Sequence, residues 1–200
     1  MSKAVIAVVD DDEGVRDSLA ALFEARGHVV ATFATAQAFL TRIADLDLGC
    51  VLLDVRLPDM GGLDVQQRLR DKGLNVPVVI MTGYGDVALA VSAMKAGARD
   101  FIEKPFQSEQ IGKAVEEALG SQSSAGRAAD TRMAGPGIDV LTPRELEVLE
   151  LLVEGLQNKM VARRLDISPS TAEVHRANIM RKLEAENFSH LIRIALAAGI

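Results

Sequence analysis

Short apolar runs rich in β-branched residues alternate with helical patterns over residues 1–119, and this alternation limits the possible folds more than any other feature. The runs that predict strands are residues 4–9, 28–33, 50–54, 77–82 and 100–103. Each is followed by apolar residues at helical spacing. Strands that alternate with helices form parallel sheets covered on both faces, because each crossover helix packs back against the sheet. The pattern therefore predicts an α/β fold with a doubly wound, five-stranded parallel sheet.

The composition changes abruptly after this region. Residues 120–137 consist mainly of Gly, Ser and Ala, and Met133 is their only large apolar residue. Such a composition is typical of a linker. We therefore expect a first domain at residues 1–119, a linker at 120–137 and a second domain at 138–200.

The second domain has the pattern of a small all-α fold. Residues 142–145 (Thr-Pro-Arg-Glu) form a capping box with proline at the first helical position. A short helix is expected at 158–165, and a longer one follows a tight turn and runs from Ser168 to about Leu183. A last helix is expected after Ser189. Two helices joined by a brief turn are typical of a helix-turn-helix.

The charge is distributed unevenly along the chain, whose net charge is −6. Residues 1–119 hold 12 Lys and Arg against 18 Asp and Glu, whereas residues 138–200 hold 8 against 9. Within the second domain, residues 156–182 hold six basic residues against two acidic ones, a local net charge of +4. This basic segment predicts contacts with nucleic-acid phosphates. The alternative is a helical bundle with an ordinary charged surface that binds a protein.

The low numbers of cysteine and aromatic residues, together with the short apolar run near the N-terminus, exclude several classes of protein. The single cysteine, Cys50, excludes an intrachain disulfide and a Cys-rich zinc or iron–sulfur site held by this chain alone. Aromatic residues make up 4% of the chain, too few for a platform that stacks single-stranded bases. Only six apolar residues separate Lys3 from the first aspartate, too few for a signal peptide or a membrane span. We therefore expect a cytoplasmic protein with no membrane partner.

The predicted strands end in polar residues that carry chemistry. Asp10 and Asp11 follow the first strand, Asp54 ends the third, Thr82 ends the fourth and Lys104 follows the fifth. In a parallel sheet these ends meet at one edge, where such folds place their sites. Three carboxylates repel one another unless a cation lies between them, and Mg²⁺ prefers oxygen ligands. The pattern therefore predicts a Mg²⁺ site at which a carboxylate attacks phosphorus, although each residue alone also has an ordinary structural explanation.

The segments VVDDDE, VLLDVRLPDMGGLD, VVIMTGYGD and AGARDFIEKPF resemble the receiver domain of bacterial response regulators, in order and spacing, over residues 3–119. The resemblance implies a flavodoxin-like receiver fold in which Asp54 accepts a phosphoryl group from a sensor histidine kinase. It implies that the Mg²⁺ ligands are Asp54, Asp11, the backbone carbonyl of Arg56 and, through water, Asp10.

The same resemblance implies further roles. Thr82 and Lys104 would hold the phosphoryl group, Phe101 would be the switch aromatic that moves with Thr82, and the Lys104–Pro105 peptide would be cis. A phosphohydrolase with an aspartyl-phosphate intermediate is the competing enzyme class, but it needs a second acid two residues after the nucleophile, where this chain has Arg56. We therefore expect a switch rather than an enzyme.

Residues 139–200 resemble the LuxR-type helix-turn-helix output domain, and the combined order resembles the NarL/FixJ family, nearest its FixJ-type regulators. The resemblance implies that residues 168–183 form the recognition helix, and that Asn158 and Lys159 meet the DNA backbone. The other candidate DNA contacts are Ser170, Thr171, Glu173, Val174, Arg176, Ala177, Arg181 and Lys182.

Individual positions of the recognition helix allow finer expectations. Val174 is a candidate contact, although its apolar side chain, like that of Ile179, favours an inward position. Ala172 and Glu173 depart from the family pattern, which usually has valine and often lysine there. We expect the Glu173 carboxylate to accept a hydrogen bond from the N4 amino group of cytosine. A weak pairing with Arg176 on the helix surface is the alternative.

Together these patterns predict a two-component transcription regulator that is phosphorylated on Asp54 and binds double-stranded promoter DNA. We expect a homodimer on phosphorylation, formed through the helix at 86–96 and the fifth strand, with RNA polymerase as a further candidate partner. A receiver that only drains phosphate from a kinase, or whose second domain binds protein or RNA, is the alternative.

Overall fold

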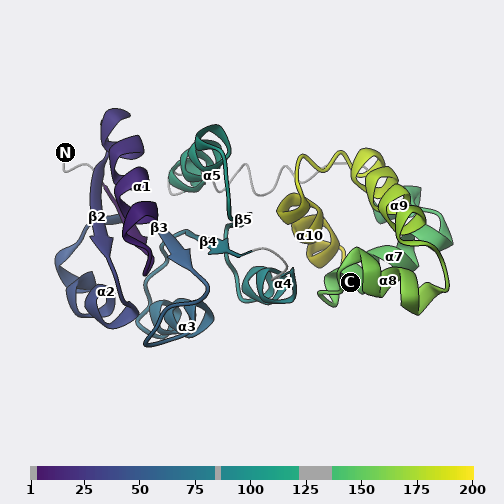
Figure 1. Ribbon diagram of the computed structural model, residues 1–200, viewed down its shortest axis with the longest axis horizontal. Coiled ribbons are helices and arrows are strands. Elements are labelled where there is room, and N and C mark those ends of the chain that lie inside the picture. The colour runs from purple at the N-terminus through teal and green to yellow at the C-terminus, as the bar shows by residue number, and fades with distance from the viewer. Residues whose placement is uncertain (1–3, 84–86, 122–136) are drawn as a thin grey trace. The chain divides into compact units, whose positions relative to one another are not determined.

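The computed structural model describes residues 4–83, 87–121 and 137–200 (Figure 1). These residues form two compact units. The first contains the described residues up to 83 and from 96 to 121, and the second contains 87–95 and 137–200. The expected linker falls almost wholly outside the described residues.

The first unit is built on a five-stranded sheet whose neighbouring strands are all parallel. The strands lie in the order β2-β1-β3-β4-β5. Their bounds are β1 Val5–Val9, β2 Val29–Phe33, β3 Leu48–Asp54, β4 Val78–Thr82 and β5 Asp100–Glu103. The predicted parallel sheet is confirmed.

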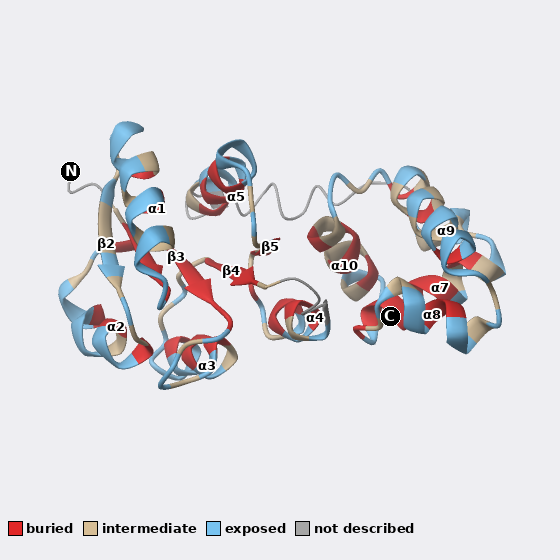
Figure 2. Ribbon diagram, viewed as in Figure 1, coloured by how far each residue is buried: buried red, intermediate tan, exposed pale blue. Residues whose placement is uncertain are grey.

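β3 starts two residues before its predicted start because Gly49 hides the strand pattern. Glycine is normally unfavourable inside strands, but here the absence of a side chain lets neighbouring residues pack closely against the backbone of β3. A Cβ on Gly49 would lie 2.7 Å from Leu119 Cδ2 and 2.8 Å from Ala4 Cβ. All seven residues of β3 are buried, as expected for a central strand covered on both faces (Figure 2).

Helices cover both faces of the sheet (Figure 1). α1 (Glu13–Ala25) and α5 (Ser108–Ser121) lie on one face, and α2 (Ala36–Arg42) and α3 (Gly62–Asp71) on the other. A 3₁₀ turn that the sequence pattern did not reveal, η1 (Ile43–Asp45), follows α2. The core between the sheet and the helices α1 and α5 includes Leu19, Phe23, Ile111, Val115 and alternate residues of the strands.

The second unit contains four consecutive helices after a 3₁₀ turn, η2 (Ile138–Val140). The helices are α7 Pro143–Val153, α8 Asn158–Leu165, α9 Pro169–Lys182 and α10 Phe188–Ala197. The helix α4 (Val87–Lys95), which follows β4 in sequence, groups with this unit. The helices pack on one another through buried residues that include Leu149, Leu152, Val161, Ile179 and Leu191.

Capping side chains define the helix ends of the second unit. The capping box predicted at the start of α7 is present, with the Thr142 side chain accepting from the Glu145 backbone N–H and Glu145 accepting in return. Ser168 caps α9 and Asp166, at φ 53°, makes the turn before it. α10 starts at Phe188, two residues before the start expected after Ser189, because the Asn187 side chain caps it.

Candidate functional site

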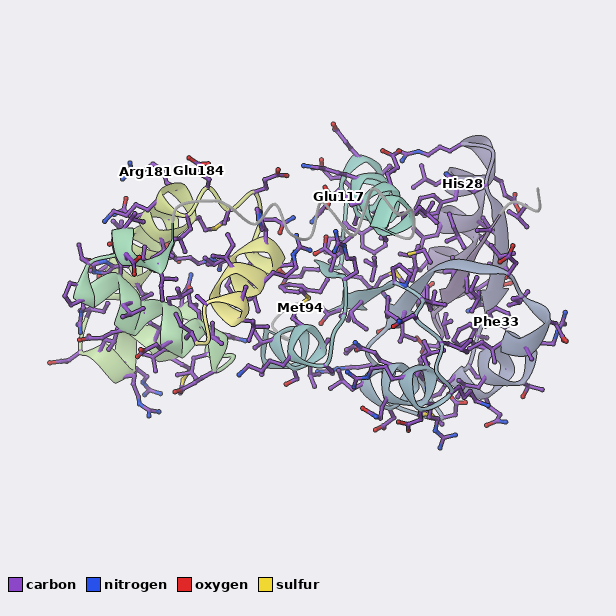
Figure 3. All side chains as sticks on the ribbon, turned by 180° about the vertical axis from the view of Figure 1, so that it is seen from behind. His28, Phe33, Met94, Glu117, Arg181 and Glu184 are labelled. Atoms are coloured by element: carbon purple, nitrogen blue, oxygen red, sulfur yellow. The ribbon has the colours of Figure 1, made fainter. Side chains whose placement is uncertain are left out.

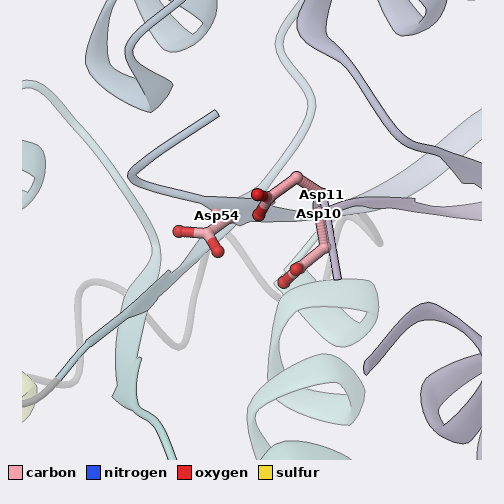
Figure 4. A group of neighbouring side chains, drawn as sticks. All are labelled: Asp10, Asp11 and Asp54. Atoms are coloured by element: carbon pink, nitrogen blue, oxygen red, sulfur yellow. The ribbon is translucent and has the colours of Figure 1, made fainter. Parts of the chain in front are cut away.

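Three carboxylates gather at the carboxyl edge of the sheet. β1 and β3 are neighbours and end together, so Asp10, Asp11 and Asp54 each offer an oxygen within 4.8 Å of the others (Figure 4). Asp10 and Asp54 are buried, whereas Asp11 is exposed. An oxygen-only set of three carboxylates fits a hard divalent cation such as Mg²⁺. The order of the strands in the sheet therefore brings the three acidic candidates together.

Lys104, the residue after the fifth strand, joins this cluster. Its Nζ donates to Asp10 Oδ2 at 2.6 Å and to Asp54 Oδ2 at 2.5 Å. Burial by itself would lower the pKa of Lys104, but the hydrogen bonds to the two carboxylates outweigh it and raise the pKa above its ordinary value. Burial raises the pKa of Asp10, against the opposing effect of its bond to Lys104. The lysine therefore stays charged and offsets part of the negative charge.

The remaining receiver candidates line the adjacent strands. Thr82 ends β4 and is buried, and its carbonyl accepts from the Lys104 backbone N–H at 2.7 Å. Phe101 is half-buried in β5, opposite Ile80. The Lys104–Pro105 peptide is cis, as predicted. The backbone thus ties the end of β4 directly to the residue that contacts both acids.

The loop after Asp54 folds back on itself. The Arg56 backbone N–H donates to Asp54 Oδ1 at 2.9 Å, and Arg56 forms an antiparallel bridge with Gly61. The Gly62 N–H then donates to the carbonyl of Val55 at 2.9 Å. This arrangement brings the start of α3 against the end of β3 and fixes one oxygen of Asp54.

The candidate DNA contacts lie mainly on one face of α9. Ser170, Thr171, Glu173, Val174, Ala177 and Arg181 are exposed. Figure 3 shows Arg181 near the end of α9. Arg176 and Lys182 are half-buried and have partners within the unit: the Arg176 guanidinium lies 4.4 Å from the Phe188 ring centroid, and Lys182 donates to Glu145 at 2.7 Å. On α8, Lys159 is exposed and Asn158 is half-buried.

The inward position expected for Val174 is wrong. Its side chain is 58% exposed, while Ala172 and Ile179 are buried at 1% and 0%. Successive helical residues turn by about 100°, so Val174 lies about 200° around the helix from Ala172. Its place among the candidate DNA contacts therefore fits the structure better than the inward assignment does.

Comparison with known families gives one match for each unit. The Response regulator receiver domain family matches residues 6–116. The luxR family of bacterial regulatory proteins matches residues 139–195. This chain belongs to the response regulators. It combines a receiver with a LuxR-type DNA-binding domain, so it is a phosphorylation-activated transcription regulator rather than an enzyme.

Full-length relatives share this organisation of the response regulator. The transcriptional regulatory protein FixJ of Azorhizobium caulinodans is 47% identical over 98% of this chain and 93% of its own. FixJ of Bradyrhizobium diazoefficiens is 44% identical over 100% of this chain and 98% of its own. The crystal structure of full-length FixJ from B. japonicum matches with a TM-score of 0.61 at 44% identity, over 100% of this chain and 98% of that one. The predicted resemblance to FixJ-type regulators is confirmed.

Two side chains that hold loops in the receiver of this response regulator were not predicted from the sequence. The Arg16 guanidinium contacts the loop that carries Asp10 and Asp11. The Asp59 carboxylate accepts from the backbone N–H groups of Ala36 at 3.0 Å and Gln37 at 2.8 Å, and these bonds lower its pKa. The Asp59 contacts join residues 22 and 23 positions apart, and the Arg16 contacts depend on how the loop turns before α1, so neither follows from a sequence pattern. Among the residues that the structure describes, no helix is long and apolar enough to cross a membrane.

Proposed function

We propose that this response regulator accepts a phosphoryl group on Asp54 from a sensor histidine kinase and then binds double-stranded promoter DNA through α9. The observation that carries the proposal is the position of Asp54, which lies with Asp10, Asp11 and Lys104 in one cluster. The carboxylate would form a bond to phosphorus while the bond from phosphorus to the kinase histidine breaks.

The charges around Asp54 support transfer of a phosphoryl group. Mg²⁺ would be held by Asp11, Asp54, the backbone carbonyl of Arg56 and, through water, Asp10; when bound, it supplies positive charge to the transferred oxygens. Lys104 already contacts Asp54 and would exchange its carboxylate contact for a phosphoryl oxygen. The Thr82 hydroxyl would donate to another such oxygen, and Phe101 would change position with it.

The output would be contact between α9 and the major groove. The exposed face of α9 carries Ser170, Thr171, Glu173, Val174, Ala177 and Arg181, and Asn158 and Lys159 begin α8. Recognition helices enter the major groove with such a face, while the preceding helix crosses the backbone. Arg176 and Lys182 would join the DNA only by leaving their present partners.

The wider organisation of the protein is proposed on the same grounds. The receiver would occupy residues 1–119, a linker 120–137 and the DNA-binding domain 138–200. These boundaries enclose both family matches, and they leave α4 in the receiver because the receiver match spans it, although α4 groups with the second compact unit. Phosphorylation would produce a homodimer through α4 and β5, and RNA polymerase is the further candidate partner. A protein that binds promoter DNA would act in the cytoplasm.

The phosphoacceptor is tested by incubating the full chain with acetyl phosphate and Mg²⁺ and locating base-labile phosphate by mass spectrometry. Asp54→Asn removes the nucleophile but keeps its shape, so it should abolish incorporation. Asp17→Asn, an exposed change on α1, is the matched control and should leave incorporation unchanged. Full labelling of the Asp54 variant would reject the assignment.

A further inference from the structure

The loop that carries Asp10 and Asp11 is held by a side chain outside the acidic cluster. Arg16 belongs to the first turns of α1, and its Nη1 donates to the backbone carbonyls of Asp10 and Asp11, each at 2.8 Å. We propose that Arg16 is a positioning residue for the divalent cation, because it fixes the backbone from which Asp10 and Asp11 reach the metal. This inference rests on the proposed function.

Asp10 is fixed at several other points. Its backbone N–H donates to the carbonyl of Phe33, its Oδ1 accepts from the Asp12 N–H at 3.0 Å and its Oδ2 accepts from Lys104. Removal of one more bond would change its position little. The effect of Arg16 on the metal site must therefore come mainly through the neighbouring residue.

Asp11 is the acid that depends on Arg16. It is exposed, and its backbone carbonyl accepts a hydrogen bond from Arg16. A carboxylate on a loose loop must lose conformational freedom when it binds a cation. Arg16 reduces that loss by fixing the Asp11 backbone before the cation arrives, as residues behind the ligands commonly do.

Arg16 lies at a position in α1 that is electrostatically unfavourable for a cationic side chain, so another interaction must offset this cost. α1 begins at Glu13, so Arg16 is its fourth residue, where the positive end of the helix dipole disfavours a cationic side chain. The two carbonyls provide that interaction. Asp12 caps the same helix by accepting from the Val15 N–H at 3.2 Å, so the anchor of the Arg16 side chain is itself well defined.

Three variants separate the position of the loop from the charge of the guanidinium. Arg16→Met removes both charge and donor and should weaken Mg²⁺ binding about 10- to 100-fold, the usual effect of losing a group behind a metal ligand. Arg16→Lys keeps the charge but replaces the planar guanidinium, whose Nη1 donates to both carbonyls, with a flexible ammonium group, so it should still bind Mg²⁺ more weakly than the wild type does. Arg68→Met removes an exposed arginine from α3 and should bind as the wild type does.

The experiment is calorimetric titration of the full-length chain with Mg²⁺ and then with Mn²⁺, without a phosphodonor. Circular dichroism of each variant verifies folding. The Mg²⁺ concentration for half-maximal phosphorylation by acetyl phosphate is measured in parallel, and it should rise in Arg16→Met while the rate at saturating Mg²⁺ changes much less.

The outcomes distinguish this inference from the proposed function. Wild-type or higher affinity in folded Arg16→Met would overturn the role of Arg16, because loss of a nearby positive charge by itself favours a bound cation. Wild-type affinity in Arg16→Lys would overturn positioning by the guanidinium. If Arg16→Met does not fold, the lysine variant decides by the same criterion. A wild-type chain that binds neither metal would overturn the proposed site itself, and the inference with it.

Discussion

Gly62 lies where the fold leaves little room beside Asp54, the proposed phosphoacceptor. It begins α3, and a Cβ there would lie 2.5 Å from the carbonyl oxygen of Asp54 and 2.9 Å from Val55 Cα. Both neighbours are backbone atoms, so no side chain can rotate away. Ordinary contact begins at 3.4 Å, and Gly62→Ala therefore requires α3 and the end of β3 to separate by roughly 1 Å.

The cost of this separation can be bounded. Adding a methyl group to a packed region typically costs about 1–3 kcal/mol, and the better helix propensity of alanine returns at most about 1 kcal/mol. The 2.9 Å bond from the Gly62 N–H to the Val55 carbonyl would also lengthen. We expect a net destabilisation of about 1–2 kcal/mol, together with slower phosphorylation because the carbonyl that moves belongs to Asp54.

The assay is scanning calorimetry of the full chain, with the rate of acetyl-phosphate labelling measured on the same samples. Gly61→Ala is the matched control. Its Cβ would meet only the flexible Asp64 side chain at 3.2 Å, and its φ of −65° suits any residue. Gly61 is the N-cap of α3, and the poorer capping by alanine is offset by the lower entropy of the unfolded chain, so a change within about 0.5 kcal/mol is expected. Wild-type stability and labelling in Gly62→Ala, or a larger loss in Gly61→Ala, would refute the steric argument.

Three other results are expected. The hydrogen bond from Lys182 lowers the pKa of Glu145 from 4.5 to about 2, so the stability that the Glu145 carboxylate contributes is present above pH 4.5 and is lost as the pH falls toward 2. The free energy of unfolding of Glu145→Gln should therefore be about 1–3 kcal/mol lower than that of the wild type at pH 7. A difference that persists at pH 2 in denaturant titrations would contradict the ion pair. Glu173→Ala should relax the base preference at one operator position in each half-site, measured against a library of single-base variants, and uniform tightening for every sequence would exclude base readout. Phosphorylated full-length protein should sediment as a dimer, whereas Asp54→Asn treated with the same donor should remain a monomer; a phosphorylated monomer would count against the homodimer.

Much of the fold and of the acidic cluster can be predicted from the sequence. Short apolar runs rich in β-branched residues predict each strand, and the strand ends place Asp10, Asp54 and Lys104 at one edge without any knowledge of side-chain contacts. The bonds of Arg16 and Asp59 could not be predicted in this way, because they join side chains to backbone groups that only loop geometry brings near.

Val174 shows where interpretation of the sequence failed. Its apolar side chain suggested a buried position, but the helical angle from Ala172 places it on the outer face, and it is 58% exposed. Angular position within a capped helix was the better guide there than hydrophobicity. The structural roles of Gly49 and Gly62 could not be predicted from the sequence either, because the need for glycine depends on which atoms lie beside it in the fold.

The most direct test of phosphorylation-controlled DNA binding is the affinity of the full chain for DNA with and without a phosphodonor. The DNA is a duplex selected from a random library by the phosphorylated protein, and binding is measured at several salt concentrations to verify contact with phosphates. With acetyl phosphate and Mg²⁺ the wild-type affinity should rise about 5- to 150-fold, the usual range of coupling between two sites, and the affinity of Asp54→Asn should not change. An equal rise in the variant, or no rise in a fully phosphorylated wild type, would contradict control through Asp54.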